Sequence, residues 1–366
     1  MAVEYGSPRI ARNSIVSNRQ SKQFFGGLGG GGIALVATPR AEVIDNILAD
    51  NSVGSGGGGG GLFLNGAGES VIAGNVIHGN EAAHAAPGDS PSQGGGIKII
   101  NDSPVLVVQN LITGNSADWG GGVLWTLPDK EPRLRLINNT IAFNPASLGS
   151  AVYANGYDGN VELINNILAG SAGAAVVHCG DVSAKSFPGL RANCLYSAGG
   201  ALFTGECTDS ILTEGNITVD PKFADATGAD FHPSSDSPCV DAGTPGAAPA
   251  LDPEGRPRPC GAGVDMGAYE VCALPAPRFV RGDATGEGGR NITDAVMVLL
   301  YLFSGGGQPG CLKAADSDDS GILNISDPIY WLSYLFLGGP PPPGSEGCAA
   351  DATADELDCE TPPGCR

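Results

Sequence analysis

An asparagine recurs at nearly regular intervals through the first half of this chain. Seven copies are each followed, one or two residues later, by an aliphatic residue, at spacings of 33, 29, 35, 29, 27 and 27 residues. The copies are Asn13, Asn46, Asn75, Asn110, Asn139, Asn166 and Asn193. Five of them have a second asparagine five positions on, namely Asn18, Asn51, Asn80, Asn115 and Asn144. A repeat of this length predicts stacked structural units, because each unit is too short to bury its own apolar side chains.

The segments around the asparagines have the composition of short β-strands. Residues 43–48 and 134–139, for example, are rich in aliphatic residues and contain no proline. No stretch before residue 290 keeps a 3.6-residue apolar period over a helical length. Units of 27 to 35 residues with two or three such strands suit one coil of a parallel β-helix, in which each strand pairs with its counterpart in the next coil. We therefore expect a mainly β solenoid over residues 1–215.

The asparagines and glycines suggest how each coil turns. Asparagine tolerates the left-handed backbone region better than other non-glycine residues, so we expect the repeated asparagines to form the bends. Amides at the same bend of successive coils can hydrogen-bond to one another as a ladder. Four copies are also followed by glycine runs that precede a strand, at residues 30–32, 59–61, 94–96 and 120–122. These runs predict a second bend where backbones approach closely, and the matching strands that follow argue against flexible linkers.

On these residues, the chain over roughly 8–200 resembles the right-handed parallel β-helix repeats of bacterial surface and secreted proteins. The N-x-I-x-x-N and G-G-G-I elements carry the resemblance. Relatives with this fold include pectate lyases, polygalacturonases and other enzymes that act on polysaccharides, and also adhesins without known chemistry. The resemblance therefore implies the fold and leaves the activity open.

The charge balance excludes some classes of partner. The chain has 39 acidic and 19 basic residues, with a formal net charge of −20. A surface of this sign disfavours nucleic acid and anionic membranes as partners. The longest apolar stretches, residues 295–303 and 329–337, have about half the length needed to cross a bilayer, so we predict no transmembrane segment.

The cysteines predict an oxidising compartment. All ten lie at or beyond Cys179, in parts rich in glycine and proline, and their spacings do not match a CxxC zinc pattern. An even number placed in this way predicts disulfides and an extracellular or cell-surface protein. The first residues lack the features of a signal peptide, and the first coil has no polar cap. We therefore expect an N-terminally truncated piece of a longer secreted protein, or a chain that starts at a late methionine.

Residues 216–272 keep aliphatic positions but lose the asparagine period. The patterns D-P-x-F, S-P-x-x-D-x-G and D-x-G-A-x-E occur in that order. They resemble the C-terminal coil region of β-helix proteins with varied anchors, which implies terminal coils or a cap over the last coil. Four carboxylates here might suggest an acid–base pair, but acids beside glycine in turns are more often turn and capping residues, and we favour that structural role. They are Asp241, Asp252, Asp265 and Glu270.

Two twelve-residue loops near the C-terminus have the spacing of calcium ligands. Residues 283–294 and 316–327 place oxygen-bearing side chains at positions 1, 3, 5, 9 and 12 and glycine at position 6, and each runs into an apolar helix. Calcium takes six to eight oxygen ligands, one of them a backbone carbonyl at position 7 in such loops. The predicted ligands are Asp283, Thr285, Glu287, Gly289, Asn291 and Asp294 in the first loop, and Asp316, Asp318, Ser320, Ile322, Asn324 and Asp327 in the second.

These loop–helix pairs, 33 residues apart, resemble a divergent dockerin type I module over residues 279–359, within a C-terminal domain of residues 273–366. The resemblance implies bound Ca²⁺ and a cohesin-like or other surface protein as partner. Thr285 and Glu287 depart from the usual ligands, so we expect weaker binding by the first loop. Aromatic and apolar residues on the helices are interface candidates, although some of them must pack between the helices: Met297, Tyr301, Tyr330, Trp331 and Tyr334.

The sequence shows no recognisable catalytic motif, and we predict no specific catalytic residue. Residues that could serve a polysaccharide enzyme or stack on sugars are Lys98, Lys130, Arg133, Arg135, His78, Glu81, His84, Asp118, Trp119, Trp125, Tyr153 and Tyr157. Lone histidines and loop acids are usually solvated surface residues. We therefore favour a non-catalytic adhesion, scaffold or glycan-binding protein. The alternative is a secreted polysaccharide lyase or glycoside hydrolase attached through the dockerin-like module.

Overall fold

The computed structural model describes most of the chain, in two compact units of residues 1–272 and 273–366. The described residues are 1–21, 29–101, 103–126, 134–155, 161–180, 188–207, 215–272, 278–344, 347–351, 353, 355 and 357–359. The first unit is a parallel β-helix, and the described part of the second contains three helices and an antiparallel pair of short strands. Each unit is described by itself below.

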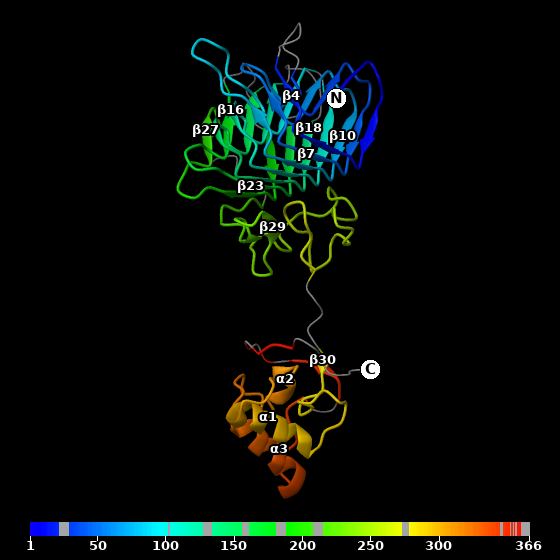
Figure 1. Cartoon of the computed structure of the whole chain (residues 1–366), viewed down its shortest axis with the longest axis vertical. Helices are drawn as coiled ribbons and strands as arrows, with labels where there is room; N and C mark the ends of the chain where they lie inside the picture. Colours follow the sequence, from blue (N-terminus) through cyan, green and yellow to red (C-terminus); the bar gives the residue numbers. More distant parts are fainter. Residues whose placement is uncertain are drawn as a thin grey trace. The chain divides into compact units, whose positions relative to one another are not determined.

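Three parallel sheets form the walls of the β-helix, and each coil contributes one strand to each wall (Figure 1). Sheet A contains β1 (Ala2–Glu4), β5 (Ile33–Val36), β9 (Leu62–Asn65), β13 (Ile97–Ile100), β17 (Val123–Thr126), β21 (Val152–Asn155), β24 (Val177–Cys179) and β27 (Phe203–Gly205). Sheet B contains β2 (Arg9–Ala11), β6 (Glu42–Ile44), β10 (Ser70–Ala73), β14 (Val105–Val108), β18 (Leu134–Ile137), β22 (Val161–Ile164) and β25 (Gly189–Arg191). Sheet C contains β3 (Ser14–Val16), β7 (Ile47–Ala49), β11 (Val76–His78), β15 (Leu111–Thr113), β19 (Thr140–Ala142), β23 (Ile167–Ala169) and β26 (Cys194–Tyr196).

Two short sheets continue the coils between sheet C and the next strand of sheet A. One contains β4 (Arg19–Gln20), β8 (Ser52–Val53) and β12 (Glu81–Ala82), and the other contains β16 (Ala117–Trp119) and β20 (Ala146–Leu148). Strands pair in register with their counterparts one coil away, as Ile97 does with Leu62 on one side and Val123 on the other. The predicted mainly β solenoid is therefore confirmed.

The interior of the stack is filled by aliphatic side chains from all three walls. Residues that point inward along β9, β13 and β17, such as Leu64, Ile99 and Trp125, are fully buried in one continuous core. Trp125 was a candidate for stacking on sugars, and its burial shows that this prediction is wrong. Its large indole instead fills the core of the coil, where burial of apolar area favours folding.

Two asparagine ladders run along the bends on either side of sheet C. In the first ladder, the amide oxygen of each asparagine accepts hydrogen bonds from the backbone N–H and the side-chain amide of the asparagine one coil before. Asn75 donates in this way to Asn110, at 2.9 Å from both nitrogens. The second ladder repeats the arrangement, for example from Asn80 to Asn115. The predicted ladders are confirmed, and the first extends further than expected because Asn193 donates to Asn216.

The left-handed residue of each bend is the one before the ladder asparagine. Asp45, Gln109 and Ala192 have φ angles of 54°, 57° and 51°, and each precedes a ladder asparagine. The prediction that the ladder asparagines themselves adopt the left-handed conformation is therefore wrong. The preceding residue turns the backbone, and the asparagine then points its amide into the stack.

Residues 220–272, called the lateral segment below, pack against the side of the coils, next to the bend between sheets B and C (Figure 1). The segment includes the antiparallel pair β28 (Phe223–Asp225) and β29 (Asp230–Pro233). Asn138 donates to the carbonyl oxygens of Asp265 and Gly267, and Asn165 exchanges two hydrogen bonds with Thr244. These contacts lie along the stack, whereas a cap would cover its end.

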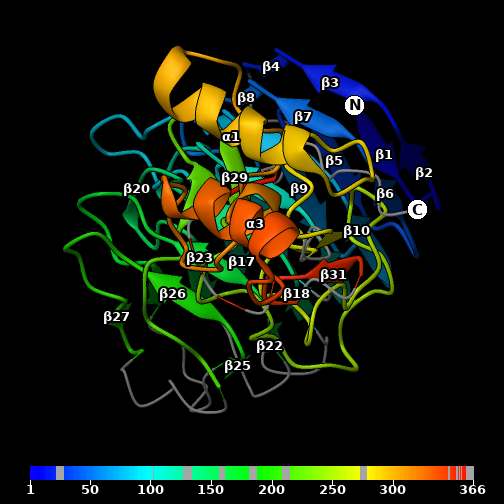
Figure 2. The ribbon, with the colours of Figure 1, turned by 90° about the horizontal axis from the view of Figure 1, so that it is seen from below.

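The C-terminal unit is built around two adjacent helices, α1 (Ile292–Ser304) and α3 (Ser326–Leu337), as Figure 2 shows. The short helix α2 (Leu312–Ala315) lies between them in the sequence. Strands β30 (Arg278–Phe279) and β31 (Ala349–Ala350) pair antiparallel and bring the two ends of the unit together. The Cys311–Cys359 disulfide also links the core of the unit to its C-terminal tail.

Candidate functional site

Both predicted calcium loops end at the start of a helix, where the last acid of the loop closes back on an asparagine. Asn291 caps α1 by accepting a hydrogen bond from Thr293 N, while Asp294 accepts one from Asn291 N. In the second loop, Asn324 N likewise donates to Asp327. A carboxylate at a helix N-terminus is favoured by the helix dipole, so each loop fixes its last acid in place.

The second loop brings three carboxylates together. Asp316, Asp318 and Asp327 each offer an oxygen atom, and these atoms lie within 4.8 Å of one another. Asp316 and Asp327 are fully buried, and Asp318 is half-buried. The backbone N–H groups of Ser320 and Gly321 donate to Asp316, which holds its carboxylate in the loop. Hard oxygen donors in this arrangement could hold a metal ion.

The electrostatics of this group favour added positive charge. Burial, together with hydrogen bonding to Asp316 and the charges of Asp318 and Asp316, raises the pKa of Asp327 to about 7. Burial also raises the pKa of Asp316, although Arg281 lies 3.8 Å from its carboxylate. Carboxylates this close disfavour ionisation of one another, and a bound cation removes that cost.

The first loop gathers fewer charges. Thr285 donates through its backbone N–H and its hydroxyl group to Asp294, at 3.0 and 2.9 Å. Asp283 is buried and accepts a hydrogen bond from Gly288 N, and burial raises the pKa of its carboxyl group. Among the described residues, this loop has no group of three converging carboxylates comparable to that of the second loop.

The remaining predicted calcium ligands of both loops do not belong to the group of three carboxylates. Glu287 is exposed and accepts a hydrogen bond from the side-chain amide of Asn291, and Gly289 is half-buried in the same loop. The hydroxyl group of Ser320 and the amide of Asn324 both donate to the backbone oxygen of Ile322. The amide oxygen of Asn324 accepts from Ser326 N. The side-chain oxygen of Asn291 thus caps α1, whereas Asn324 lies just before Ile325, the N-cap residue of α3.

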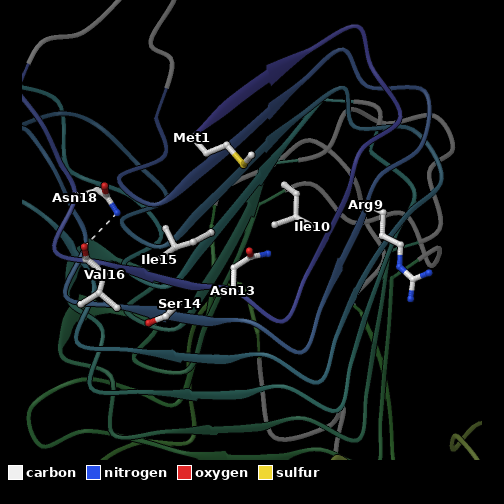
Figure 3. Close-up of a pocket in the computed structure, with 8 residues that line it drawn as sticks. All are labelled: Met1, Arg9, Ile10, Asn13, Ser14, Ile15, Val16 and Asn18. Carbon is white, nitrogen blue, oxygen red and sulfur yellow. Dashed lines mark hydrogen bonds between the residues drawn. The ribbon is translucent and has the colours of Figure 1, made fainter.

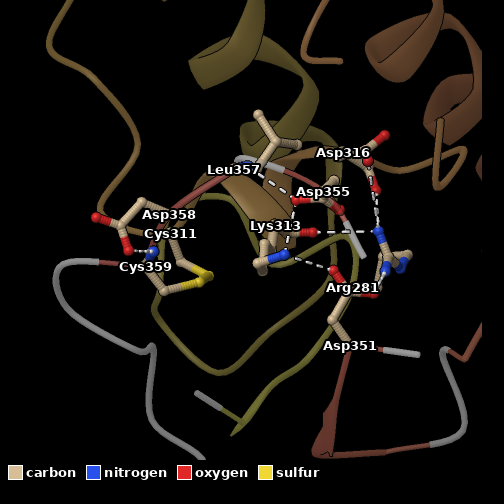
Figure 4. Close-up of a disulfide and its surroundings, with 9 residues drawn as sticks. All are labelled: Arg281, Cys311, Lys313, Asp316, Asp351, Asp355, Leu357, Asp358 and Cys359. Atoms are coloured by element: carbon tan, nitrogen blue, oxygen red, sulfur yellow. Dashed lines mark hydrogen bonds and ion pairs between the residues drawn. A yellow bond between two sulfur atoms is a disulfide. The ribbon is translucent and has the colours of Figure 1, made fainter. Parts of the chain in front are cut away.

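An ion-pair cluster that the sequence did not reveal lies beside the second loop (Figure 4). Arg281 contacts Asp319 and Asp351, each at 2.8 Å. Lys313 contacts Asp351 at 3.0 Å and Asp355 at 2.7 Å. Asp316, Asp319 and Asp355 form a second converging group of carboxylates, but the side chains of Arg281 and Lys313 already neutralise it. The cluster joins residues about 70 positions apart, so no local sequence pattern could have predicted it.

The helices of this unit expose an apolar face. Ile292, Val296, Leu300 and Phe303 of α1 are 50%, 45%, 49% and 66% exposed, and their spacing places them on one side of the helix. Ile329, Phe336 and Leu337 of α3 are also exposed. Of the interface candidates, Met297, Tyr301, Tyr330 and Tyr334 are half-buried.

Trp331 was a further interface candidate, and the structure shows that this prediction is wrong. Its side chain is 1% exposed, and its indole N–H donates to Asn291 O at 3.0 Å. The ring also covers Gly282, where an added Cβ would lie 2.9 Å from it. Trp331 therefore connects α3 to the first loop from within the core.

On the β-helix, one row of side chains crosses sheet A on the face opposite the main core, and Phe63, Leu124 and Tyr153 in this row are buried. Strand pairing places Phe63, Lys98, Leu124, Tyr153 and His178 side by side in that order. The ammonium group of Lys98 lies 5.8 Å from the centre of the Phe63 ring. Burial lowers the pKa of Lys98 to about 8.

Aromatic rings continue this row. Trp119 stacks on Tyr153 with the ring centres 5.2 Å apart, and the centre of the His178 ring lies 4.8 Å from that of Tyr153. Burial lowers the pKa of His178 and raises that of Tyr153. We call this set of residues, from Phe63 to His178 together with Trp119, the sheet A row.

The sequence of the coils that carry this row matches a family model. Residues 9–187 match the family model of the right handed beta helix region. This match and the three parallel sheets identify this part of the chain as a right-handed parallel β-helix. No curated protein and no solved structure matches the chain. No helix in the described part of the chain is long and apolar enough to cross a membrane.

The other residues considered for catalysis on the right-handed β-helix have structural partners or lie apart. Asp118 binds His84 at 2.7 Å and accepts hydrogen bonds from Ala85 N and Ser92 N. Although burial opposes it, these hydrogen bonds lower the pKa of Asp118 to about 2, so the group holds a turn as an anion. His78 is half-buried, whereas Glu81 and Arg135 are exposed. Lys130, Arg133 and Tyr157 lie outside the described residues.

The carboxylates of the lateral segment also have structural roles. Asp252 accepts hydrogen bonds from Glu254 N, Arg256 N and Glu270 N. Glu270 accepts from Asp265 N and lies 3.4 Å from Arg258, with both side chains fully buried. Asp265 accepts from Asp241 N and Val271 N, and Asp241 accepts from Gly263 N. These contacts agree with a structural role for the four acids.

The first coil of the β-helix borders a hollow of about 570 Å³ (Figure 3). Its lining residues are Met1, Arg9, Ile10, Asn13, Ser14, Ile15, Val16 and Asn18. Ile10 and Ile15 correspond to side chains that later coils bury inside the stack. The described residues that line it include no carboxylate.

Proposed function

We propose that this protein works outside the cell or at the cell surface as a non-catalytic adhesion, scaffold or glycan-binding protein, attached through a calcium-stabilised C-terminal module. Three described disulfides support an oxidising compartment. The β-helix supplies a long surface of repeated coils, a form used by many proteins to present binding sites.

The observation that carries the calcium part of this proposal is the convergence of Asp316, Asp318 and Asp327 in a twelve-residue loop. The same loop–helix pattern occurs 33 residues earlier, where Asp283, Thr285 and Asp294 would hold a second ion. Bound Ca²⁺ would supply the positive charge that lets the buried acids remain ionised. The role of the loop itself would be to hold the ligand oxygens in position around the ion and to exclude water.

The attachment part rests on the exposed face of α1. Ile292, Val296, Leu300 and Phe303 form an apolar stripe, which suits a protein partner better than a polar glycan. By resemblance to dockerin, that partner is a cohesin-like or other surface protein. We expect Leu300→Asp to abolish retention on an immobilised panel of cohesin modules while leaving calcium binding unchanged. Equal retention of the variant and the wild type would contradict this use of the stripe.

The calcium proposal is tested by titration of the metal-free full chain. We expect two binding events with Kd values on the order of 10⁻⁵ to 10⁻³ M, the tighter one in the second loop. Asp327→Asn should remove the tighter event and leave the weaker one. Absence of binding heat and of any thermal shift at millimolar Ca²⁺ would rule the proposal out.

A matched control separates the two acidic groups that share Asp316. Asp319→Asn makes the same change of charge in the same loop, but Asp319 pairs with Arg281 and lies outside the ligand spacing. We expect this variant to keep the tighter calcium event. If Asp319→Asn loses the event and Asp327→Asn keeps it, the cation site is not the predicted loop.

A second candidate function, polysaccharide cleavage, is favoured by one feature of the sheet A row. Burial lowers the pKa of Lys98 to about 8, so its amine can be neutral and accept a proton near neutral pH. Incubation of the calcium-loaded protein with pectins, alginates, xylans and sulfated glycans distinguishes the candidates. New reducing ends or unsaturated products that are lost in Lys98→Met would favour the enzyme, and retention on a glycan without cleavage would favour the binding protein.

A further inference from the structure

Two cysteines in the described part of the chain remain thiols and lie in the same buried cluster. They are Cys194 in β26 and Cys239 in the lateral segment, and both are fully buried. Ile167, Ala192 and Met266 belong to the same cluster. The side chains of both cysteines belong to this one cluster, and the Cys194 thiol donates to Val219 O at 3.4 Å.

The backbone holds Cys239 in position from both sides. Cys239 N donates to the hydroxyl oxygen of Ser237 at 3.1 Å, and Cys239 O accepts from Met266 N at 2.9 Å. Cys194 is fixed within sheet C, where it pairs with Ile167. Two thiols in contact on well-fixed backbones are placed to react with each other rather than with other groups.

The other described cysteines are already paired. Cys179 is bound to Cys207, Cys260 to Cys272 and Cys311 to Cys359, and Cys348 is disulfide-bonded as well. A compartment that oxidises these residues would also oxidise a neighbouring pair of thiols during folding. Two free thiols in contact would then be an exception within the same molecule.

We propose that Cys194 and Cys239 form a further disulfide bond, which fastens the lateral segment to the last coils of the β-helix. The bond joins positions 45 residues apart and adds a covalent link to the hydrogen bonds made by Asn138 and Asn165. Cys260–Cys272 is a disulfide within the lateral segment. Among the described residues, no other disulfide than the proposed one would link this segment to the coils.

The reaction requires an external disulfide, either of a small molecule or of an oxidoreductase. One cysteine thiolate attacks that disulfide, forms a mixed disulfide and releases the first thiolate of the oxidant. The second cysteine thiolate then attacks the protein sulfur of the mixed disulfide and releases the second. The protein loses two protons and two electrons, and the oxidant leaves as two thiols.

Burial determines when this reaction occurs. The hydrogen bond from Cys239 and burial together raise the pKa of the Cys194 thiol far above its usual range, so little thiolate forms in the folded protein. Oxidation must therefore precede the docking of the lateral segment, or accompany its transient opening. Once docked, the bond is protected from reductants by the same burial.

Peptide mapping of the wild-type full chain tests the proposal. The protein is refolded in a mixture of reduced and oxidised glutathione, alkylated in denaturant and digested without reduction. We expect a linked peptide containing Cys194 and Cys239, with neither cysteine alkylated. Alkylation of both, in a sample whose Cys179–Cys207 bond is intact, would overturn the proposal, because that bond shows that oxidation was sufficient.

Two variants supply matched controls. Cys194→Ser should leave Cys239 as a newly alkylated site, and Cys239→Ser should do the same for Cys194. The double serine variant should unfold roughly 5–15 °C below the oxidised wild type. An unchanged midpoint would contradict the fastening role, and if the variant does not fold, the map of the wild type still decides whether the bond exists.

Discussion

Asn110 lies in the middle of the first ladder and is fully buried. Its amide oxygen accepts two hydrogen bonds from Asn75, and its amide nitrogen donates to Ile72 O at 2.8 Å. Replacement by alanine leaves these buried groups without partners. We expect Asn110→Ala to lower the free energy of unfolding by about 2–5 kcal/mol in a denaturant titration.

Asn13 provides a control at the end of the same ladder. It donates to Asn46, but it is exposed, so water can replace the lost bonds. We expect Asn13→Ala to cost less than about 1 kcal/mol. Similar losses for the two variants would mean that burial does not set the strength of the ladder.

A second prediction at the residue scale concerns pH. Burial raises the pKa of Asp327 to about 7 in the folded, metal-free protein, above its value in the unfolded chain. This group therefore stabilises the fold fully at pH values below about 4, and that contribution is lost as the pH rises through about 7. In EDTA, the thermal midpoint of the C-terminal unit should fall between pH 5 and pH 8.

Saturating Ca²⁺ should remove this fall, because the cation replaces the proton on the carboxylates. Asp327→Asn should flatten the pH dependence in EDTA, since an amide does not titrate in this range. A midpoint in EDTA that rises from pH 5 to pH 8 would show that the assigned direction of the pKa shift is wrong.

The bends show how far residue types predict this fold. Asparagine at the ladder position strongly predicts the bend. Its side chain is buried inside the stack, where its oxygen accepts hydrogen bonds and its nitrogen donates them, so few other residues fit there. The left-handed position before it holds Arg12, Asp45, Gln109 and Ala192 in different coils. Its side chain points away from the stack, so many residues are tolerated and the sequence contains no consistent signal for it.

At the scale of elements, the glycine runs connect one coil to the next. A Cβ added to Gly95 would lie 2.6 Å from Gly121 O and from Ser116 N, both backbone atoms of neighbouring turns. These atoms cannot move without breaking strand pairing. We expect Gly95→Ala to destabilise the β-helix by about 2–4 kcal/mol, measured by denaturant unfolding.

Gly54→Ala is the matched control for this substitution. The nearest atom to an added Cβ at Gly54 is Gln20 O, at 3.6 Å, which is an ordinary contact. We expect a change within about 0.5 kcal/mol, or slight stabilisation through the unfolded state. A loss at Gly54 equal to that at Gly95 would show that close backbone approach is not the reason for the glycine runs.

Elements formed by local patterns were predictable, and contacts between distant elements were not. The coil strands and the helices after both acidic loops follow from apolar periodicity and the capping residues. The lateral segment docks through Asn138 and Asn165. In the sequence each is simply the first residue of an Asn-Asn pair, and nothing there predicts the contact. The Arg281–Asp351 pair has no local signal at all.

At the scale of the whole molecule, the two units have separate cores. The main core of the β-helix contains residues such as Leu64 and Ile99, whereas Phe279, Val298 and Ala315 belong to clusters within the C-terminal unit. The proposed calcium loops lie only in the second unit. Since each core is buried by its own unit, heating should produce two unfolding transitions.

Calcium should move only one of these transitions. A ligand that binds the folded state at 100 times its Kd adds about 2.7 kcal/mol, which for a unit of this size raises the midpoint by roughly 10–20 °C. In calorimetry of the full chain, we expect calcium to raise the midpoint of one transition by that amount and to leave the other midpoint unchanged. The calcium-dependent shift should disappear in the double variant Asp327→Asn and Asp294→Asn. Mg²⁺ at the same concentration is the control, because its smaller, octahedral coordination fits such loops poorly. A calcium-dependent shift of both transitions would show that the metal also binds the β-helix, and the search for a functional site would then move to the coils.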